Sequence, residues 1–439
     1  MSDLFGRYIL GAAVPIMLIG LGIFFLFYLG FFFIIKPKKA FSVLRSSGSG
    51  KGVSSFGALT VALAGTLGVG NIVGVASAII LGGAGAVFWM CISAFAAMVL
   101  KYAEIVLAHK HRRQSNDGIR GGAMYYIEDF FGGRIGKTFG SIFAILCLVN
   151  SLSMGCMLQS NAVSSSLGEI SDISPALTGA VLALICGAVI LRGVHDISPL
   201  TSVVIPVMTV LYVGMSAVVI WQFRDGIGEV LSLILSEAFS VESASGGIFG
   251  FLLSSQIRYG CMRGLLSNEA GCGTAPIAHA ASRAEKSAEQ GIWGIIEVFV
   301  DTVLLCTLTA LSILLVFGDG TGGFATGEEM KLVIASYGAA LGGKSAILMT
   351  VMVFFFAFAT IICWAYYGTV TLGYLTKSKW AQRIFKIVYI ACVFIGACRI
   401  SGIVWQISDF ALGSMTVINL IILFLMRKEI KKETELFMR

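Results

Sequence analysis

The chain alternates between long apolar runs and short polar loops. The first apolar run covers residues 8–35. Ten more lie near 56–80, 84–108, 138–167, 175–191, 200–223, 248–283, 290–317, 345–375, 384–398 and 403–426. A helix needs about 20 predominantly apolar residues to cross a bilayer. The pattern therefore predicts an all-α polytopic membrane protein with eleven transmembrane helices, one N-terminal helix and a core of ten.

Two of these runs are interrupted at mid-depth. Four glycines interrupt 56–80, namely Gly65, Gly68, Gly70 and Gly74, and the segment 267–273 interrupts 248–283. Each interior glycine costs a helix roughly 1 kcal/mol relative to alanine. Lipid offers no water to freed backbone groups, so a broken backbone persists only inside protein or along a cavity. The breaks predict a central site for a ligand or ion, with close helix packing on small residues as the alternative.

The two interrupted runs occupy corresponding positions in the chain. The ten core helices divide into five over 56–223 and five over 248–426, and each half begins with a broken helix. Because five is odd, the two halves would cross the membrane in opposite orientations. Paired interrupted helices in inverted repeats are typical of secondary transporters. We expect such a core in a single transporter domain over 1–439, with a cytoplasmic tail over 427–439.

Charge supports the membrane assignment and orients the chain. Of 439 residues, 57% are hydrophobic and 13% are charged, against about 25% charged in soluble domains. With the N-terminus outside, the inner segments hold 23 of the 31 lysines and arginines, and the outer segments hold five. Basic residues concentrate on the cytoplasmic side of membrane proteins. The net charge of +7 thus reflects topology and gives no indication of a nucleic-acid partner.

Eight ionisable residues fall within the predicted spans. They are Lys101, Glu104, Arg258, Arg263, Glu269, Glu297, Asp301 and Asp409. Charges at this depth are costly, so they pair with one another or serve a function. We expect Lys101 to pair with Glu104, and Glu297 and Asp301 to meet a cation such as Lys101 or Arg263. Arg258 and Asp409 are expected in the outer half as a gate pair.

Motifs for enzyme chemistry or metal binding are absent from the sequence. The ten cysteines are scattered singly, and among the four histidines only His109 and His111 lie close together. The chain also has no phosphate-binding loop, catalytic triad or paired-carboxylate motif. It therefore predicts neither an enzyme nor an organic cofactor.

Seven segments resemble one transporter family closely and in that family's order. They are LAGTLGVGNIVGVASAI, GAVFWM, KYAEIVLAHKHR, GGAMYYIED, RGLLSNEAGCGTAPIAHAA, EVFVDTVLLCTLTAL and FAFATIICWAYYG, spread over about residues 55–425. The chain resembles the alanine or glycine:cation symporter family. The resemblance implies a leucine-transporter type of fold with an extra N-terminal helix. It also implies sodium-coupled symport of a small neutral amino acid, alanine or glycine, through the cell inner membrane by alternating access.

The resemblance also implies roles for individual residues. The substrate-binding residues would be Thr66, Val69, Gly70, Asn71, Gln159, Leu266 and Trp364. The sodium ligands would be the carbonyls of Ala64 and Leu67 with the hydroxyl of Thr360. Ala359 departs from the family, since a hydroxyl residue is usual there.

Three other functions remain open from the sequence. Proton coupling through Glu269 or Asp301 is the first. A channel, or a transporter of an unrelated solute, is the second. A membrane-embedded structural or receptor subunit is the third, although such a subunit would not need two matched broken helices.

The topology can be tested directly. We expect reporter fusions to place the N-terminus in the periplasm and the tail RKEIKKETELFMR in the cytoplasm, because basic residues concentrate in the segments on that side. Location of both ends on the same side of the membrane would contradict the prediction of eleven spans.

Overall fold

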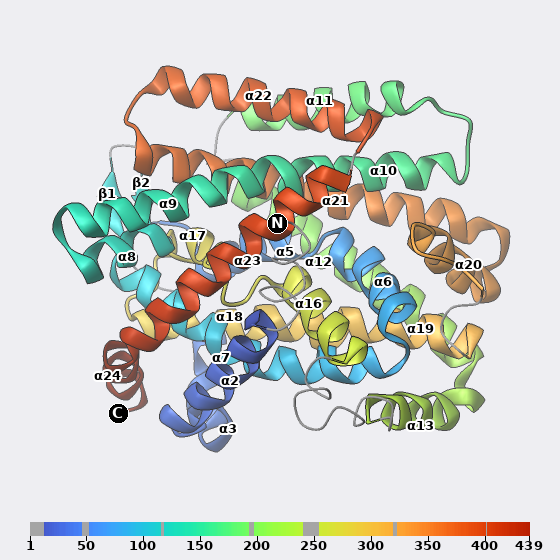
Figure 1. The fold of residues 1–439 in the computed structure, drawn as a ribbon, viewed down its shortest axis with the longest axis horizontal. Coiled ribbons are helices and arrows are strands. Elements are labelled where there is room, and N and C mark those ends of the chain that lie inside the picture. The colour runs from blue at the N-terminus through green and yellow to red at the C-terminus, as the bar shows by residue number, and fades with distance from the viewer. Residues whose placement is uncertain are drawn as a thin grey trace.

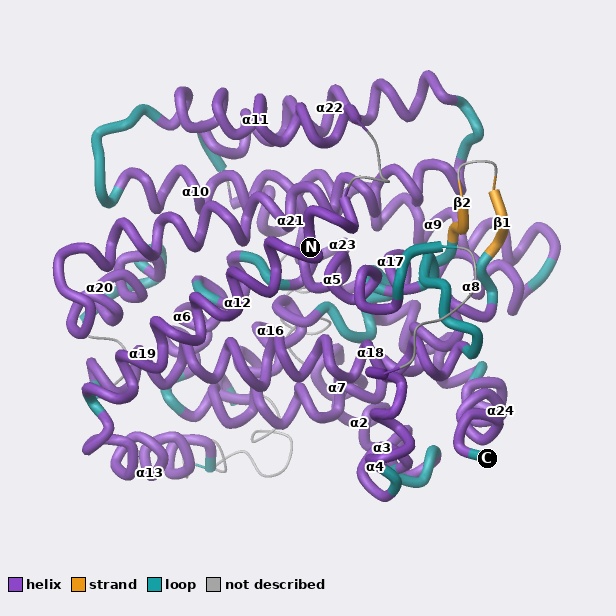
Figure 2. Tube along the Cα trace, turned by 180° about the vertical axis from the view of Figure 1, so that it is seen from behind, coloured by secondary structure: helices purple, strands orange, loops and turns teal. Residues whose placement is uncertain are grey.

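The computed structural model describes residues 13–45, 52–115, 118–192, 197–239, 254–318, 323–400 and 402–439. These residues are mostly helical, as predicted (Figure 1). A short antiparallel hairpin joins β1 (Arg113–Ser115) to β2 (Gly118–Arg120), and Figure 2 shows it at one end of the molecule.

Eight of the predicted spans are long and apolar enough to cross a membrane, counting the bent pair α5 and α6 as one. Two further predicted spans correspond to shorter apolar helices, α2 (Val14–Tyr28) and α11 (Pro175–Arg192). The described part of 248–283 contains α16 (Ser255–Asn268) and α17 (Pro276–His279). The count of eleven therefore stays a prediction, while the helical class is confirmed.

The first break lies where the glycines predict it. Helix α5 (Ser55–Thr66) begins after Ser54, whose hydroxyl accepts a hydrogen bond of 2.9 Å from the Gly57 amide. A short 3₁₀ turn, Val69–Asn71, separates α5 from α6 (Val73–Gly82), and the two helices form an angle of 63°. The helix breaks because Gly68 adopts an extended conformation that ends the helical hydrogen bonding.

The second break also lies at its predicted position. Helix α16 ends at Glu269, which adopts a left-handed conformation with φ 51°. Gly271 and Gly273 follow with φ 80° and 78°. Glycine takes these angles without penalty, whereas Glu269 is strained there. The Asn268 side chain accepts a hydrogen bond of 2.9 Å from the Ala270 amide and supports the turn.

The long helices run roughly parallel across Figure 1, and α23 crosses over them. Figures 1 and 2 both place α11 and α22 side by side at one edge. The other bounds are α7 Gly85–Lys110, α8 Ala123–Phe131, α9 Gly133–Leu152, α10 Gln159–Gly168, α12 Ile197–Gln222, α13 Ile227–Ala238, α18 Ser287–Val298, α19 Thr307–Phe317, α20 Glu329–Leu341, α21 Ser345–Leu375, α22 Lys379–Cys398, α23 Gly402–Leu425 and α24 Arg427–Met438. Two π-helical segments, Ser153–Leu158 and Phe299–Cys306, connect α9 to α10 and α18 to α19. Short helices after α2 are α3 Phe32–Ile35 and α4 Pro37–Ala40.

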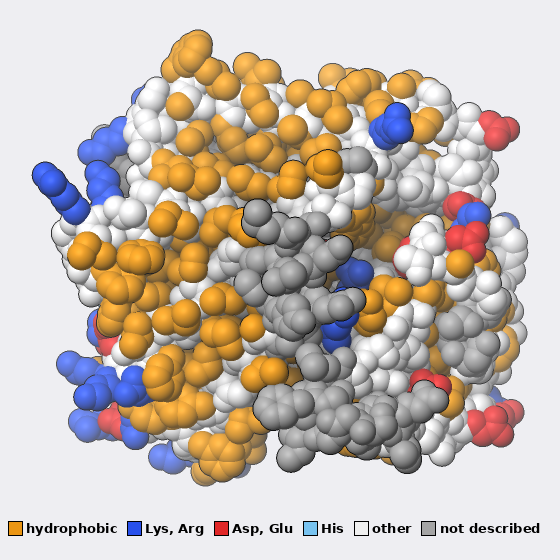
Figure 3. Space-filling model, in the orientation of Figure 1, with side chains coloured by type: hydrophobic (Ala, Val, Ile, Leu, Met, Phe, Trp, Pro, Cys, Tyr) orange, Lys and Arg blue, Asp and Glu red, His pale blue; other side chains and the backbone are white. Residues whose placement is uncertain are grey.

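The surface separates the two signs of charge. In Figure 3, lysine and arginine side chains gather at one end of the molecule, acidic side chains gather at the other, and hydrophobic side chains lie between them. The basic end is the one that carries the hairpin and α24 in Figure 1. This is the separation that basic cytoplasmic loops produce.

A cluster of charged side chains holds α24 against the basic end. His111 lies between Asp129 at 2.8 Å and Glu429 at 3.1 Å, and Lys110 bonds to Glu429 at 3.1 Å and Glu433 at 2.7 Å. Burial opposes protonation of His111, but hydrogen bonds to Glu429 and Asp129 outweigh it and raise the pKa of the imidazole. The hydrogen bond from His111 also lowers the pKa of Glu429 to about 2. The charged imidazole thus favours docking of α24.

Docking of α24 should therefore depend on pH. A group with a raised pKa in the docked state stabilises docking fully below its ordinary pKa, about 6.5 for histidine. That contribution is lost as the pH rises through the raised value. We expect α24 amides to exchange more slowly in the wild type than in His111→Gln at pH 6. The difference should vanish at high pH, and a constant difference would contradict the prediction. The two proteins are compared at the same pH, so the pH dependence of the intrinsic amide exchange rate affects both equally.

Candidate functional site at the helix breaks

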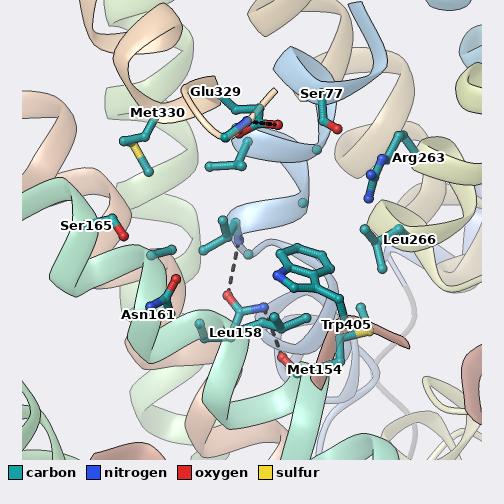
Figure 4. Close-up of a pocket in the computed structure, with 18 of the residues that line it drawn as sticks. Ser77, Met154, Leu158, Asn161, Ser165, Arg263, Leu266, Glu329, Met330 and Trp405 are labelled. Carbon is teal, nitrogen blue, oxygen red and sulfur yellow. Dashed lines mark hydrogen bonds between the residues drawn. The ribbon is translucent and has the colours of Figure 1, made fainter. Parts of the chain in front are cut away.

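A cavity of about 400 Å³ lies against the first break (Figure 4). The break itself supplies one wall. The opposite walls come from α9–α10, α16, the start of α20 and the start of α23. The lining includes Thr66, Gly68, Val69, Gly70, Met154, Leu158, Gln159, Asn161, Arg263, Leu266, Glu329, Met330 and Trp405. Five predicted substrate residues, Thr66, Val69, Gly70, Gln159 and Leu266, thus lie around one cavity.

Backbone amides face the cavity at the break. The Val69 amide donates to Gln159 Oε1 at 3.2 Å, and the Gly68 amide donates to Asn71 Oδ1 at 3.1 Å. Within the described part of the chain, no acceptor bonds to the amide of Gly70. Gln159 is held in turn by a bond of 3.3 Å from Nε2 to the Met154 carbonyl, as Figure 4 shows. The cavity wall therefore offers one unpartnered amide beside an amide whose acceptor is a movable side chain.

The backbone at Gly68 is in close contact with two side chains. A Cβ atom there would lie 2.9 Å from Thr360 Oγ1 and 3.0 Å from Gln159 Oε1. Carbon atoms do not approach oxygen so closely without displacement. Glycine is required at this position because Thr360 and Gln159 both reach the exposed backbone.

Two backbone carbonyls lie free of helical bonding on the α5 side of the break, and that of Leu67 faces Thr360. The last helical hydrogen bond of α5 runs from the Leu67 amide to the Leu63 carbonyl, at 2.7 Å. The Gly68 amide donates to the Thr66 carbonyl and does not continue the helix. The carbonyl of Ala64 thereby loses its helical donor. Thr360 Oγ1 lies 3.3 Å from the Leu67 carbonyl and 3.0 Å from Phe356 O in its own helix. The three predicted sodium ligands thus come from the break and from the α21 residue that faces it.

The two tryptophans near the break differ in position. Trp364 is fully buried behind the break, where its Nε1 donates to the Gly65 carbonyl at 3.3 Å, and it does not line the cavity. Trp405 of α23 projects into the cavity opposite Leu158 (Figure 4). The aromatic wall of the cavity is therefore Trp405, and Trp364 supports the backbone of α5.

Asn71 also lies behind the cavity wall. Its Nδ2 donates to Asp301 Oδ1 at 2.8 Å and to Ser267 Oγ at 2.9 Å. Ser267 donates in turn to Asp301 Oδ2 at 2.7 Å, and Thr302 does so at the same distance. Asp301 thus joins the first break, the end of α16 and the π-helical segment after α18 through fully buried hydrogen bonds.

Arg263, five residues after Arg258, is the cation that lines the cavity. Its guanidinium points into the cavity in Figure 4 and interacts electrostatically with Asp409 and Glu329. Arg258 instead packs its guanidinium over the ring of Tyr259, 5.0 Å from the centroid. The described ion pairs do not include one between Arg258 and Asp409. They include none between Arg263 and Asp409 either, so the predicted pair of Arg258 with Asp409 is not formed, and Asp409 acts on Arg263 only through longer-range electrostatics.

A fully buried ion cluster fills the space on the other side of the breaks. Lys101 Nζ lies 3.3 Å from Glu297 Oε1 and 3.8 Å from Glu104 Oε1. The pair with Glu104 is as predicted, and Lys101 is one of the two cations expected for Glu297. The expectation of a cation beside Asp301 is wrong, because its described partners are polar side chains. His279 of α17 bonds to the second oxygen of Glu297 at 2.9 Å and to Gln290 at 2.7 Å. Removal of one partner from a buried pair typically costs about 3–5 kcal/mol. The cluster thus fixes α17 against α7 and α18.

The same cluster holds the second break. Glu104 Oε2 accepts hydrogen bonds from the Gly273 amide at 3.0 Å and from Asn419 Nδ2 at 2.9 Å. Asn419 also donates to the Gly271 carbonyl at 2.9 Å. The backbone groups freed at Gly271 and Gly273 are therefore satisfied by side chains from α7 and α23.

Sequence reasoning missed three participants. Trp405 stands four residues before Asp409 on one helix face, and that spacing could have indicated a shared wall. Met154 contributes its backbone carbonyl, which no side-chain pattern reveals. His279 follows Pro276 within the second interrupted run, and its place beside Glu297 depends on a contact between distant segments.

Comparison with known proteins agrees with this architecture. The model of the sodium:alanine symporter family matches residues 2–439. An uncharacterized transporter of Haemophilus influenzae is 38% identical over 98% of this chain and 93% of its own length. The sodium/alanine symporter AgcS of Methanococcus maripaludis is 35% identical over 98% and 95%. The structure of MhsT in complex with L-phenylalanine has a TM-score of 0.58 at 12% identity, over 86% of this chain and 90% of that one. The leucine-transporter type of fold is thus confirmed. The chain is a membrane transporter and not an enzyme, and it belongs to the sodium:alanine symporter family.

Proposed function

We propose that the protein couples inward movement of sodium to symport of a small neutral amino acid, alanine or glycine. The observation that carries the proposal is the first break. Within residues 64–70 the Ala64 carbonyl loses its helical donor, the Leu67 carbonyl faces Thr360, and the Gly70 amide beside the cavity has no acceptor among the described residues. Carbonyls suit a cation and amides suit a carboxylate, so one stretch of backbone serves both solutes.

Sodium would bind on the carbonyl side of the break. The carbonyls of Ala64 and Leu67 and the hydroxyl of Thr360 are oxygen ligands, which hard cations prefer. The carboxy-terminal end of α5 carries partial negative charge from its free carbonyls, and this adds to the attraction. Thr360 already lies within 3.3 Å of the Leu67 carbonyl, so binding requires little rearrangement.

The amino acid would bind on the amide side. Its carboxylate would take the Gly70 amide, and the Val69 amide once Gln159 rotates away, at a turn that leads into the amino-terminal end of α6. Its side chain would face Leu158, Leu266 and Trp405. Apolar walls on this face suit a small apolar side chain.

The two ends of the cavity suggest how access alternates. Toward the acidic end of the molecule the cavity reaches Arg263, Glu329 and Trp405, and toward the basic end the buried ion cluster around Lys101 blocks it. We propose that Arg263 and Asp409 form the outer gate and that the Lys101 cluster closes the inner path. The halves 56–223 and 248–426 would move as inverted repeats in the cell inner membrane, with the N-terminus outside.

Proton coupling is a second candidate, and one observation favours it. Glu269 is fully buried, its Oε2 accepts a hydrogen bond of 2.6 Å from Thr274, and its Oε1 has no partner among the described residues. A buried carboxylate oxygen without a partner is less costly when it carries a proton. Glu269 would then bind the coupling proton.

Transport into proteoliposomes separates the two candidates. We expect an inward sodium gradient to drive uptake of labelled alanine or glycine at constant pH. An inward proton gradient without sodium should not drive it. Uptake that follows the proton gradient, and is lost in Glu269→Gln, would show that the coupling ion is the proton and not sodium. Absence of alanine and glycine uptake under both gradients would contradict the assigned substrate.

Thr360 should determine sodium affinity. Thr360→Ala removes one oxygen ligand, and we expect the half-saturating sodium concentration for uptake to rise roughly tenfold, equivalent to about 1.4 kcal/mol. Thr360→Ser keeps the hydroxyl and is the matched control, with a nearly unchanged value. An unchanged sodium dependence in Thr360→Ala would place the ion elsewhere.

Leu266 should set the size of the substrate. Leu266→Ala enlarges the cavity, and apolar pockets discriminate by about 1–3 kcal/mol per methylene. We expect the ratio of kcat/KM for valine to that for alanine to increase at least about tenfold. Leu265→Ala is the control, because Leu265 is buried next in sequence but does not line the cavity. An equal ratio in Leu266→Ala and Leu265→Ala would show that Leu266 does not line the substrate pocket.

A further inference from the structure

A second cavity lies at the basic end of the molecule and has no role in the proposed transport site. Its volume is about 550 Å³. The hairpin, α8, the start of α9, the end of α21 and the start of α22 surround it. These elements lie together at one end in Figures 1 and 2. The cavity thus opens between the ends of membrane helices.

Positive charge dominates the lining. Its charged residues are the cations Arg113, Arg120, Lys137, Lys377 and Lys379 and the carboxylate Glu128. Arg113 is paired, at 3.4 Å from Glu128 and 2.6 Å from Asp129. The ion pairs of the described chain include none to the three lysines. The lining of the cavity therefore includes three exposed lysines that form no ion pair with a carboxylate of the described chain.

The basic side chains of the cavity come from the ends of helices and from the hairpin, which hold them close to one another. Lys379 is the first residue of α22 and Lys137 lies near the start of α9, so both add to the positive ends of helix dipoles. Arg120 is fixed by a hydrogen bond of 3.3 Å to the Gly373 carbonyl, and a Cβ atom at Gly373 would lie 2.3 Å from its guanidinium. A cluster of like charges on fixed helix ends gains stability when an anion binds between them.

Exposed apolar side chains lie close in sequence to the lysines that line the cavity. Trp380 follows Lys379 directly and is 72% exposed, and Ile135 precedes Lys137 by two residues and is 62% exposed. Phe131 and Phe139 stack with ring centroids 4.9 Å apart, and both are exposed. Exposed tryptophan and aromatic rings beside lysines are typical of the membrane–water interface.

We propose that this cavity binds the phosphate of an anionic lipid headgroup, with the acyl chains lying along α9 and α22. Phosphate oxygens accept charge-assisted hydrogen bonds from lysine and arginine. Basic pockets between membrane helices on the cytoplasmic side bind anionic headgroups. Free inorganic phosphate would meet the same cations, but only a lipid would also cover the exposed faces of Trp380 and Phe139.

The test measures binding of phosphatidylglycerol to the purified full-length protein in detergent. We expect native mass spectrometry to retain phosphatidylglycerol and not phosphatidylcholine on the wild type. The triple variant Lys137→Gln, Lys377→Gln, Lys379→Gln should bind phosphatidylglycerol with an affinity at least about tenfold lower. A matched triple variant at Lys38, Lys428 and Lys432 changes the same charge outside the cavity and should bind as the wild type does. Single variants of the three cavity lysines should each lose part of the binding.

The outcomes distinguish the sources of the phosphate. Inorganic phosphate at millimolar concentration should neither displace phosphatidylglycerol nor raise the unfolding temperature of the lipid-free protein. Stabilisation by phosphate alone, abolished in the cavity variant, would overturn the lipid assignment in favour of a free anion. Equal phosphatidylglycerol binding by the cavity and matched variants would overturn the site itself. Neither readout depends on transport, so failure here leaves the proposed function standing.

Discussion

A backbone polar group that is freed in a membrane must find its partner inside the protein, and the structure is arranged around two places where this happens. At the first break the Leu67 carbonyl faces the Thr360 hydroxyl, and the Val69 amide faces Gln159. At the second, Glu104 and Asn419 bind the groups freed at Gly271 and Gly273. Lipid cannot supply these bonds. The backbone freed at the first break thus meets uncharged side chains, which the proposed solutes would replace, whereas the backbone freed at the second break meets the buried carboxylate of Glu104.

That difference separates the functional side from the structural side. The Lys101 cluster is sealed from solvent and ties α7, α17 and α18 together. The cavity, by contrast, carries a free Gly70 amide and reaches toward the acidic end of the molecule. Asp301 lies between the two, since it bonds to Asn71 at the first break and to Ser267 at the end of α16. Asp301 thereby connects the two breaks through direct hydrogen bonds.

Local features of the sequence predicted much of this arrangement. Glycine spacing located both breaks, and the cost of buried charge led to the pairs of Lys101 with Glu104 and Glu297. The sequence does not show which side of a fully buried helix packs against which neighbour. Residues 359–367 of helix α21 are all buried, so no periodicity distinguishes the face toward the first break from the other packing faces. Arg258 and Arg263 differ by five residues on a helix of 3.6 residues per turn, and only tertiary contacts show which one enters the cavity.

If one broken helix binds both solutes, each favours binding of the other by the same factor. Equilibrium binding to the purified protein measures this directly: the Kd of labelled alanine with and without sodium, and the Kd of sodium with and without alanine. We expect two ratios that are equal and well above one in the wild type. Two ratios equal to one would show that the solutes bind independently, and would contradict a shared site at the break.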